Sequence, residues 1–345
     1  MEMGGLSAAV APRTKLRRTR IAATGLGLCA LCIGAGSLWN GVAEKQWSRQ
    51  HPPPGDLYTV EGKQMHIDCT GTGSPTLVME SAASARWTQW RKVQPALSQV
   101  TRVCSYDRAG HGWSEPRSGP RDAETIVHEL HFLLDQAGVT GPFIYASESA
   151  GGLYVREYAR EFPDEVAGVA LIDSSSPQQI DELPGFRASY EEQKRQARRT
   201  LWKDRLLVWS GWERLLGHCA SGTDTTDCRP SYVDMDEDEL PYFEESSQQA
   251  GRLQNFGNIP LLVITRDTNP KNSGIAANDV AQDSVWEREQ EGSKALSPLS
   301  WRVIARGSGH IVPVDRPDVV ILEMTRMIGY LRGGLAPAFG TTIMR

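Results

Sequence analysis

The sequence has few cysteines, no excess of positive charge, and no internal repeat or low-complexity tract. Six cysteines in 345 residues are too few for a disulfide-stabilised scaffold. Five of the 37 basic residues lie within residues 1–20 with only one of the 42 acidic residues, so the rest of the chain is acidic. An acidic body argues against nucleic acid as a general partner.

What is present is typical of a globular protein. Hydrophobic residues make up 40% of the sequence and charged residues 23%, which excludes a mainly disordered chain. At roughly 100–200 residues per domain, the length corresponds to one large domain with an insertion, or to two domains.

One long uncharged segment occupies residues 21–39, directly after the basic cluster. Its 19 residues are close to the length that an α-helix needs to cross a bilayer. Two interpretations remain open. The segment is either an uncleaved membrane anchor, with the body outside the cytoplasm, or a secretory signal removed near Ala43. We favour the anchor, because the apolar part of a signal is usually only about 7–15 residues long.

Beyond residue 55, apolar strands alternate with helical segments. Residues 57–61 and 64–69 are expected to form a hairpin, and further strands are expected at 75–80, 102–106, 142–146, 166–172, 260–265 and 301–305. Helical spacing covers 123–137, 154–162 and 317–331. The expected fold class is therefore α/β, a mostly parallel sheet with helices on both faces.

Residues 177–257 interrupt this alternation with charge-rich helical sequence. Trp202, Leu206 and Trp209 recur there at helical spacing, a stripe that indicates packing. We expect a helical lid inserted between two strands of the sheet. The predicted organisation is an N-terminal segment of residues 1–50, a core of residues 51–176 and 258–345, and a lid of residues 177–257.

The cysteines beyond the N-terminal segment form two groups. Cys69 and Cys104 lie on expected strands and are interpreted as packed free thiols. Cys219 and Cys228 bracket a polar loop and are candidates for a short disulfide loop, which fits a location outside the cytoplasm.

The strongest chemical signal is Ser-Glu-Ser-Ala-Gly-Gly at residues 147–152, between an expected strand and an expected helix. A nucleophile on a sharp strand-to-helix turn needs small neighbours, and Ser147 and Gly151 provide them. Such a turn exposes the hydroxyl of Ser149 at a helix N-terminus, where the amide of Ala150 can donate to an oxyanion. The alternative is an ordinary serine in a glycine-rich turn.

Serine is a weak nucleophile and needs a general base. His310 ends the sequence Gly-Ser-Gly-His, directly after the strand expected at 301–305, and the glycines suit a loop that turns an imidazole inward. It also follows Ser149 in the chain. The alternative is a surface histidine.

With these motifs the sequence resembles the α/β-hydrolase superfamily, in particular its lidded serine esterases and proline-iminopeptidase-like members. Residues 105–114, Ser-Tyr-Asp-Arg-Ala-Gly-His-Gly-Trp-Ser, are similar to the Asp-x-Arg-Gly-x-Gly-x-Ser segment after the fourth strand of that family. Residues 75–80 match the third strand, and residues 309–317 match the histidine loop and the start of the last helix. The resemblance implies an α/β-hydrolase fold with an inserted lid.

The resemblance also assigns the second oxyanion donor. In the family the loop after the third strand is glycine-rich, whereas residues 81–86 here contain no glycine. By its place in that loop, the amide of Ala83 would act beside that of Ala150. Ser147 stands where the elbow usually has glycine, and Glu148 precedes the nucleophile, as in many carboxylesterase elbows.

The order of residues leaves the third catalytic group open. Asp173 ends the strand before the lid, and Asp267 ends the strand after it. In many relatives the acid follows the later strand, where the matching position is closer to Asn269, and in some lidded relatives it follows the earlier one. We favour Asp173, with Asp267 as the alternative acid and Asp279 and Asp283 behind them.

The leading hypothesis is a serine hydrolase that cleaves small-molecule carboxylic esters through an acyl-enzyme, with His310 as general base. Trp202, Trp209 and Trp212 of the lid predict an apolar or aromatic pocket. An aminopeptidase or amidase on the same fold is one alternative, and a non-catalytic, membrane-tethered binding protein is another. No metal, organic cofactor or nucleic acid is implied, and a membrane is the expected partner of the N-terminal segment.

Overall fold

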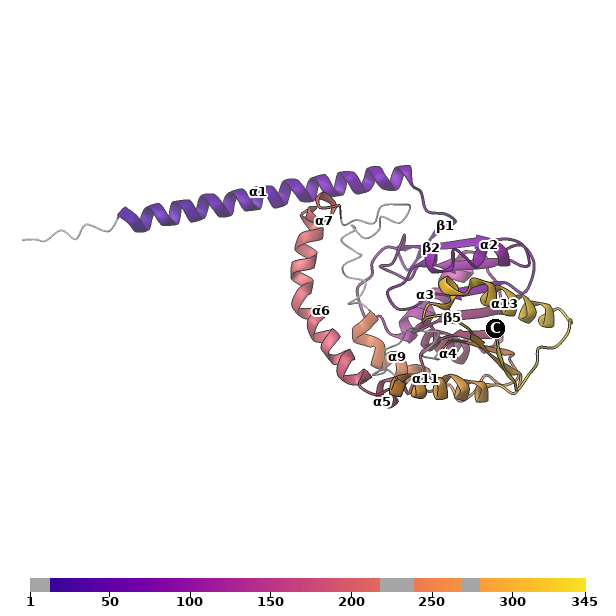
Figure 1. Ribbon diagram of the computed structural model, residues 1–345. Helices are drawn as coiled ribbons and strands as arrows, with labels where there is room; N and C mark the ends of the chain where they lie inside the picture. The colour runs from indigo at the N-terminus through magenta and orange to yellow at the C-terminus, as the bar shows by residue number, and fades with distance from the viewer. Residues whose placement is uncertain (1–12, 218–238, 268–279) are drawn as a thin grey trace, which may run out of the picture. The chain divides into compact units, whose positions relative to one another are not determined.

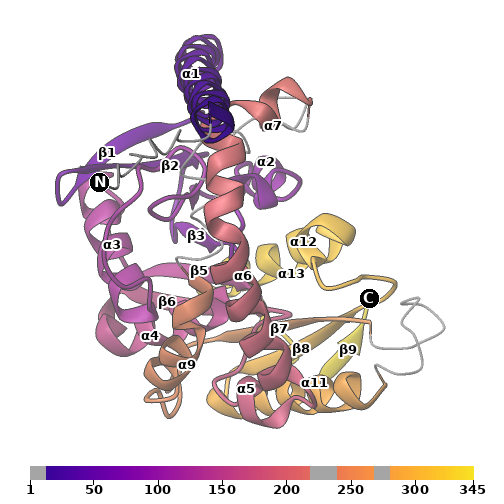
Figure 2. The same ribbon diagram turned by 90° about the vertical axis from the view of Figure 1, so that its left-hand side faces the viewer.

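The computed structural model describes residues 13–217, 239–267 and 280–345, which divide into two compact units. The smaller unit holds residues 13–51 and 203–217. The larger unit holds residues 52–202, 239–267 and 280–345. Many elements of both units are labelled in Figure 1, and further strands are labelled in Figure 2.

A nine-stranded sheet, counted over the described residues, organises the larger unit in the order β1-β2-β4-β3-β5-β6-β7-β8-β9. The pairs β1–β2 and β2–β4 are antiparallel and the remaining pairs are parallel, which confirms the expected mostly parallel sheet. The strands are β1 (Asp56–Val60), β2 (Lys63–Thr70), β3 (Leu77–Glu80), β4 (Val103–Tyr106), β5 (Phe143–Glu148), β6 (Val166–Ile172), β7 (Leu261–Arg266), β8 (Ser300–Ala305) and β9 (Thr342–Met344).

Helices cover both faces of this sheet (Figure 2). Val78 of β3 belongs to the core cluster that includes α3 (Ala123–Gln136) and α4 (Gly151–Glu161). Its neighbours Leu77 and Met79 belong to the cluster on the other face, with α2 (Gln94–Leu97) and α13 (Pro317–Leu331). The two clusters alternate along the strand because successive side chains point to opposite faces.

The segment expected to be a lid is helical in its described part. It contains α5 (Gln179–Glu182), α6 (Phe186–Trp209), α7 (Trp212–Leu215), η4 (Leu240–Tyr242) and α9 (Phe243–Ala250). The domain boundaries drawn from the sequence stay a prediction. The remaining short elements are η1 (Trp87–Trp90), η2 (Pro163–Glu165), α11 (Val280–Gly292), η6 (Ser293–Leu296) and α12 (Val312–Asp315).

Cys69 and Cys104 form a disulfide, so the interpretation of these residues as free thiols is wrong. The two residues lie directly opposite each other in the antiparallel register of β2 and β4. Opposed residues in such a pair have close Cβ atoms, which is the geometry that a disulfide needs. The pairing could not be foreseen because register is a property of the assembled sheet. Cys219 and Cys228 lie outside the described residues.

The tryptophan stripe expected to pack is also exposed instead. Trp202 is 67% exposed and Trp209 is 56% exposed, and Leu206 between them is exposed as well. Helical spacing identified a helical segment correctly, but these three side chains are largely exposed.

The smaller unit consists of α1 (Arg13–Gln50), the end of α6, and α7. In the described part of the chain one helical segment, Ala23–Gln50, is long and apolar enough to cross a membrane, judged by length and composition alone. α1 exposes most of its large apolar side chains, including Leu26, Leu28 and Leu31.

Candidate active site

Ser149 lies in the turn between β5 and α4 and has a φ of +53°. A positive φ is uncommon for a residue with a side chain, and such strain is often found at functional turns. The following glycines are required by packing. A Cβ on Gly151 would lie 2.8 Å from Glu80 Cγ, and a Cβ on Gly152 would lie 2.5 Å from Ser174 Cβ. The local sequence therefore permits a tight turn that presents the hydroxyl at the start of α4.

Three side chains from different loops meet at the carboxyl ends of the parallel strands. Ser149 follows β5, Asp173 follows β6 and His310 follows β8. His310 Nε2 lies 2.9 Å from Ser149 Oγ, and His310 Nδ1 lies 2.6 Å from Asp173 Oδ2. The structure thus brings the expected nucleophile, the expected base and the favoured acid into one hydrogen-bonded chain.

Asp173 is fully buried and is held by several donors besides His310. Its Oδ1 accepts hydrogen bonds from the Arg266 backbone N–H at 3.1 Å and from Trp286 Nε1 at 2.8 Å. Its Oδ2 also accepts from Arg266 Nη1 at 2.8 Å. Burial alone would raise the pKa of Asp173, but the hydrogen bond from His310 and the charge of Arg266 outweigh burial and lower it. Asp173 is therefore an ionised, fixed acceptor.

The electrostatic environment of His310 favours its protonated form. Burial lowers the pKa of His310, but the hydrogen bond to Asp173, the charge of Asp173 and the charge of Glu148 together raise it. Trp286 packs edge-on against the imidazole, with ring centroids 5.9 Å apart. The imidazole is thus held between the carboxylate of Asp173 and the indole of Trp286, and 40% of the His310 side chain remains exposed.

The other acidic candidates have different partners. Asp267 Oδ2 accepts a hydrogen bond from the Gly307 N–H at 3.0 Å, three residues before His310. Asp283 pairs with Arg266 Nη2 at 3.0 Å. The structure therefore places Asp173 against the imidazole and Asp267 at the base of the histidine loop. Asp279 and Asn269 lie outside the described residues.

The loop after β3 is held by a buried arginine. Arg108 donates to the Ser81 carbonyl at 3.0 Å and to the Ala82 carbonyl at 2.7 Å. The same guanidinium pairs with Glu80 and Glu239, both buried. The Ala82 N–H donates to Gln89 Oε1 at 2.9 Å. Arg108 therefore fixes the backbone that precedes Ala83, so charged contacts hold a loop that lacks glycine.

The two expected oxyanion donors stay a prediction. Ala150 is the N-cap of α4, directly after Ser149, and Ala83 lies in the loop after β3. Among the described hydrogen bonds, neither the Ala150 N–H nor the Ala83 N–H donates to a protein group. Both amides can therefore donate to a negatively charged oxygen.

Glu148 adds a second buried carboxyl group beside the imidazole. Its Oε2 accepts a hydrogen bond from Gln89 Nε2 at 2.8 Å. Its Oε1 has no hydrogen-bond partner among the described residues and lies 3.8 Å from His310 Nε2. Burial raises the pKa of Glu148 to about 7, against the opposing effects of His310 and Gln89. Its charge therefore changes near neutral pH, next to the imidazole.

A cavity of about 440 Å³ adjoins the loop that carries Ala83. Apolar surface comes from Tyr154 of α4 and from Leu240 and Phe243, and Gln193 of α6 contributes polar surface. Trp202, Trp209 and Trp212, which are expected to form an apolar pocket, do not contribute to the wall of this cavity.

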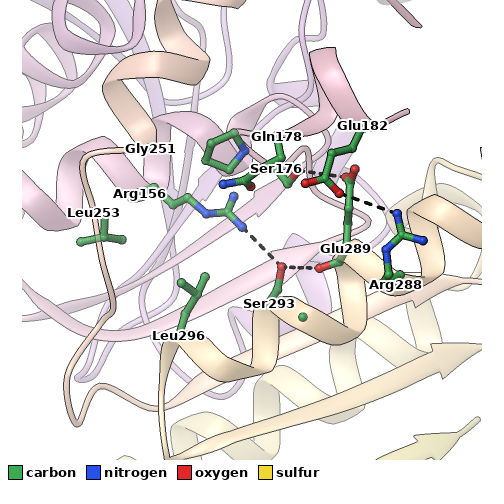
Figure 3. Close-up of a pocket in the computed structure, with 12 residues that line it drawn as sticks. Arg156, Ser176, Gln178, Glu182, Gly251, Leu253, Arg288, Glu289, Ser293 and Leu296 are labelled. Atoms are coloured by element: carbon green, nitrogen blue, oxygen red, sulfur yellow. Dashed lines mark hydrogen bonds and ion pairs between the residues drawn. The ribbon is translucent and has the colours of Figure 1, made fainter. Parts of the chain in front are cut away.

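A second cavity of about 290 Å³ lies between α4, α11 and the segment after β6 (Figure 3). The buried Arg156 points into it and donates to the carbonyls of Gly152 at 3.0 Å and Ser175 at 2.8 Å. The Ser175 N–H in turn donates to the Ser149 carbonyl at 2.8 Å. Burial lowers the pKa of Arg156 to about 10. Arg156 is therefore linked through Gly152 and Ser175 to the turn that carries Ser149, and it stabilises that turn.

Sequence reasoning missed several residues that shape this site. Trp286 lies in charge-rich helical sequence, and no motif marks it as a partner of Asp173. Gln89 and Glu239 are likewise contributed by segments without a motif. Arg108 lies within the segment of residues 105–114 that resembles the family. The sequence therefore marked the segment, but it did not predict the contacts of Arg108 with the loop after β3.

The chain is similar in sequence to known α/β hydrolases. The sequence model of the family described as "alpha/beta hydrolase fold" matches residues 75–211. An AB hydrolase superfamily protein of Gibberella zeae is 27% identical over 288 residues, which cover 75% of this chain and 87% of the relative. An uncharacterized protein of Schizosaccharomyces pombe is 28% identical over 163 residues, which cover 39% of this chain but only 30% of that relative's length.

A solved structure extends the likeness to the whole fold. The structure of a thermophilic esterase from Thermogutta terrifontis superimposes with a TM-score of 0.52 and 21% sequence identity, over 80% of this chain and 96% of the esterase. At this identity the likeness establishes the arrangement of strands and helices, and the side chains described above carry the chemical argument.

Proposed function

The chain belongs to the α/β-hydrolase superfamily, and from this premise we propose that it is a serine hydrolase that cleaves carboxylic esters through an acyl-enzyme. The observation that carries the proposal is the hydrogen-bonded chain Ser149–His310–Asp173. It supplies a nucleophile, a base within reach of its proton, and a buried acceptor that orients the base.

Under this proposal each group has a role. His310 Nε2 accepts the proton of Ser149 Oγ as that oxygen bonds to the ester carbonyl carbon. Asp173 stabilises the imidazolium that forms. The amides of Ala83 and Ala150 donate to the oxyanion of the tetrahedral intermediate. When the intermediate collapses, the alcohol leaves with the proton from His310. A water molecule, deprotonated by His310, then cleaves the acyl-enzyme, releases the acid and restores Ser149.

The cavity beside Ala83 would bind the organic part of the ester. Its walls combine aromatic and aliphatic side chains with two glutamines of α6, Gln193 and Gln196. This pattern suits a medium-sized apolar acyl or alcohol group carrying some polar substituents. A serine nucleophile also distinguishes this site from the aspartate nucleophiles that haloalkane and epoxide chemistry uses in the same fold.

Probe labelling and a substrate panel test the proposal. A fluorophosphonate probe should label the wild type, and the Ser149→Ala variant should lose both labelling and ester turnover. Chromogenic esters should be cleaved much faster than the matching aminoacyl amides. Faster cleavage of the amides would replace the esterase with an aminopeptidase or amidase. A wild type that binds ligands but is never labelled would support a binding protein instead.

We also propose that α1 anchors the protein in a membrane and that the larger unit lies outside the cytoplasm. The uncharged run with a basic flank supports the anchor and its direction. The disulfide between Cys69 and Cys104 supports an oxidising compartment. A membrane-impermeant biotin reagent applied to intact cells should modify the exposed lysines of the larger unit; their protection until lysis would contradict this orientation.

A further inference from the structure

We propose that the end of α6 together with α7 forms a bilayer-docking surface, which we call the aromatic arm (residues 206–216). The arm would lie in the head-group layer of the membrane that α1 enters. The inference rests on the proposed insertion of α1, but it is independent of the proposed hydrolase chemistry, because the arm contains none of the groups around Ser149.

Five large apolar side chains are exposed within the 11 residues of the aromatic arm, which is unusual for a surface that faces water. Leu206 is 43% exposed, Trp209 is 56%, Trp212 is 50%, Leu215 is 64% and Leu216 is 56%. Single exposed apolar residues are ordinary, but a contiguous group of this kind marks an interaction site. Tryptophan is also the side chain most suited to a boundary with one apolar and one wet side.

The aromatic arm is fastened to α1 by specific polar contacts. Asn40 is 3% exposed on a helix that is otherwise largely open, and its Nδ2 donates to the Val208 carbonyl at 2.9 Å. Arg214 Nε donates to Asn40 Oδ1 at 2.7 Å, and the same guanidinium lies 3.8 Å from Glu44. The amide of Asn40 thus joins both halves of the arm to one face of α1.

A glycine on α1 makes this close approach possible. A Cβ added to Gly36 would lie 2.0 Å from the Ser210 carbonyl oxygen, so no side chain is compatible with the observed contact. Gly34, two residues earlier on the same helix, has nothing within 4 Å of the corresponding position. Gly36, Asn40 and Glu44 are spaced four residues apart and therefore share a helix face.

The position of these contacts along α1 sets the depth of the arm. At about 1.5 Å per residue, the uncharged run of residues 21–39 is about 28 Å long, close to the roughly 30 Å of a hydrocarbon core. Gly36, Asn40 and Glu44 lie at the end of that run and just beyond it. A surface attached there lies at the boundary between acyl chains and head groups, where tryptophan is enriched.

Charge complementarity identifies the occupant as a lipid surface rather than an apolar protein groove. Residues 195–205, directly before the arm, contain five basic residues and one acidic residue. Basic residues flanking exposed tryptophan and leucine are typical of helices that lie in the plane of an anionic membrane surface.

Photolabelling from within the bilayer tests the proposal on the full-length protein. The protein is reconstituted in vesicles of phosphatidylcholine and phosphatidylglycerol in a three-to-one ratio, labelled with a lipid-soluble diazirine, and mapped by mass spectrometry. We expect label on α1 and on the aromatic arm. Peptides containing Phe132 and Leu335, which are exposed and apolar on the larger unit, serve as controls and should remain unlabelled.

A matched pair of variants separates docking from anchoring. Gly36→Ile should reduce labelling of the arm to the level of the control peptides while labelling of α1 persists, and Gly34→Ile should change neither. Turnover of a water-soluble ester should be the same in both variants. An unlabelled arm in the wild type would overturn the proposal, and so would an arm labelled equally in Gly36→Ile. If a second copy of the chain covers the arm instead, the arm carries no lipid label and a bifunctional amine-reactive cross-linker gives a dimer, which also overturns the proposal.

Discussion

Replacing Asp173 with asparagine should disable the proposed catalytic base. The asparagine has one oxygen and one NH₂ group where the carboxylate has two acceptors. Placing the NH₂ at the Oδ1 position would set it against two donors, the Arg266 N–H and Trp286 Nε1. At the Oδ2 position the NH₂ would face Arg266 Nη1, which is always a donor, and His310 Nδ1, which can become an acceptor by a change of tautomer. The lower-energy choice is therefore the NH₂ at Oδ2, because one opposed donor remains there instead of two.

That orientation determines the tautomer of the histidine. His310 Nδ1 must then accept a hydrogen bond, so Nε2 carries the proton and can no longer receive one from Ser149. The equivalent change in a serine protease lowers kcat by about 10⁴, which corresponds to about 5 kcal/mol of lost transition-state stabilisation. We expect a loss of this size in kcat for Asp173→Asn with a chromogenic ester. The thermal unfolding midpoint should also fall, because Arg266 loses one of its two carboxylate partners.

Asp267→Asn provides the matched control. Its acceptor contact with the Gly307 N–H can be kept by the amide oxygen of asparagine. We therefore expect kcat to fall by less than about tenfold, the worth of one perturbed hydrogen bond. If kcat is lost in Asp267→Asn and is normal in Asp173→Asn, the assignment of Asp173 as the acid is refuted.

Three further changes have expected outcomes. Glu148→Gln removes a negative charge that helps to raise the pKa of His310, and since His310 must be neutral to act as base, the acid limb of the pH profile of kcat/KM should move to lower pH. Replacing Cys69 and Cys104 by alanine opens a loop with a sequence separation of 35 and should lower the free energy of unfolding in urea by about 3–4 kcal/mol. Gly152→Ala forces a Cβ to within 2.5 Å of a neighbouring side chain and should reduce fluorophosphonate labelling.

Each of these has its own check. A pH profile for Glu148→Gln that shifts to higher pH would show that its carboxyl does not act through charge. Reductant should destabilise the wild type as much as the cysteine replacements do; a smaller effect would mean that the bond is not formed in solution. Gly292→Ala, where a Cβ meets nothing within 4 Å, is the control for Gly152→Ala, and equal labelling of the two variants would contradict the packing argument.

The parts of the site that depend on local sequence were predictable. Ser149 and His310 each lie in a short glycine-containing turn next to a strand, so the turn chemistry is visible in a few adjacent residues. The acid was ambiguous because Asp173 and Asp267 both follow buried strands, and only the packed sheet shows which one faces the imidazole. The partners of Asp173 come from β7 and α11, which no sequence spacing connects to β6.

The fold was likewise predictable where it depends on local sequence and not where it depends on how elements pack. Apolar periodicity located most strands and the helices α3, α4 and α13, because burial of one face leaves a local pattern. The Cys69–Cys104 bond depended on the register between two strands, which no single strand encodes. The stripe of Trp202 and Trp209 showed a real helix face, but periodicity cannot distinguish a face that packs on protein from a face left open.

Arg108 has a consequence for how the site can be controlled. One guanidinium bonds to the carbonyls before Ala83 and to Glu239, which belongs to the segment expected as lid. A ligand that displaces Glu239 would remove a partner of Arg108, and this change would reach the backbone before Ala83, the proposed oxyanion donor, without contact with Ser149. Inhibitors of this protein could therefore be sought among compounds that break the buried Arg108–Glu239 ion pair. Such compounds differ from reagents that react with the serine hydroxyl.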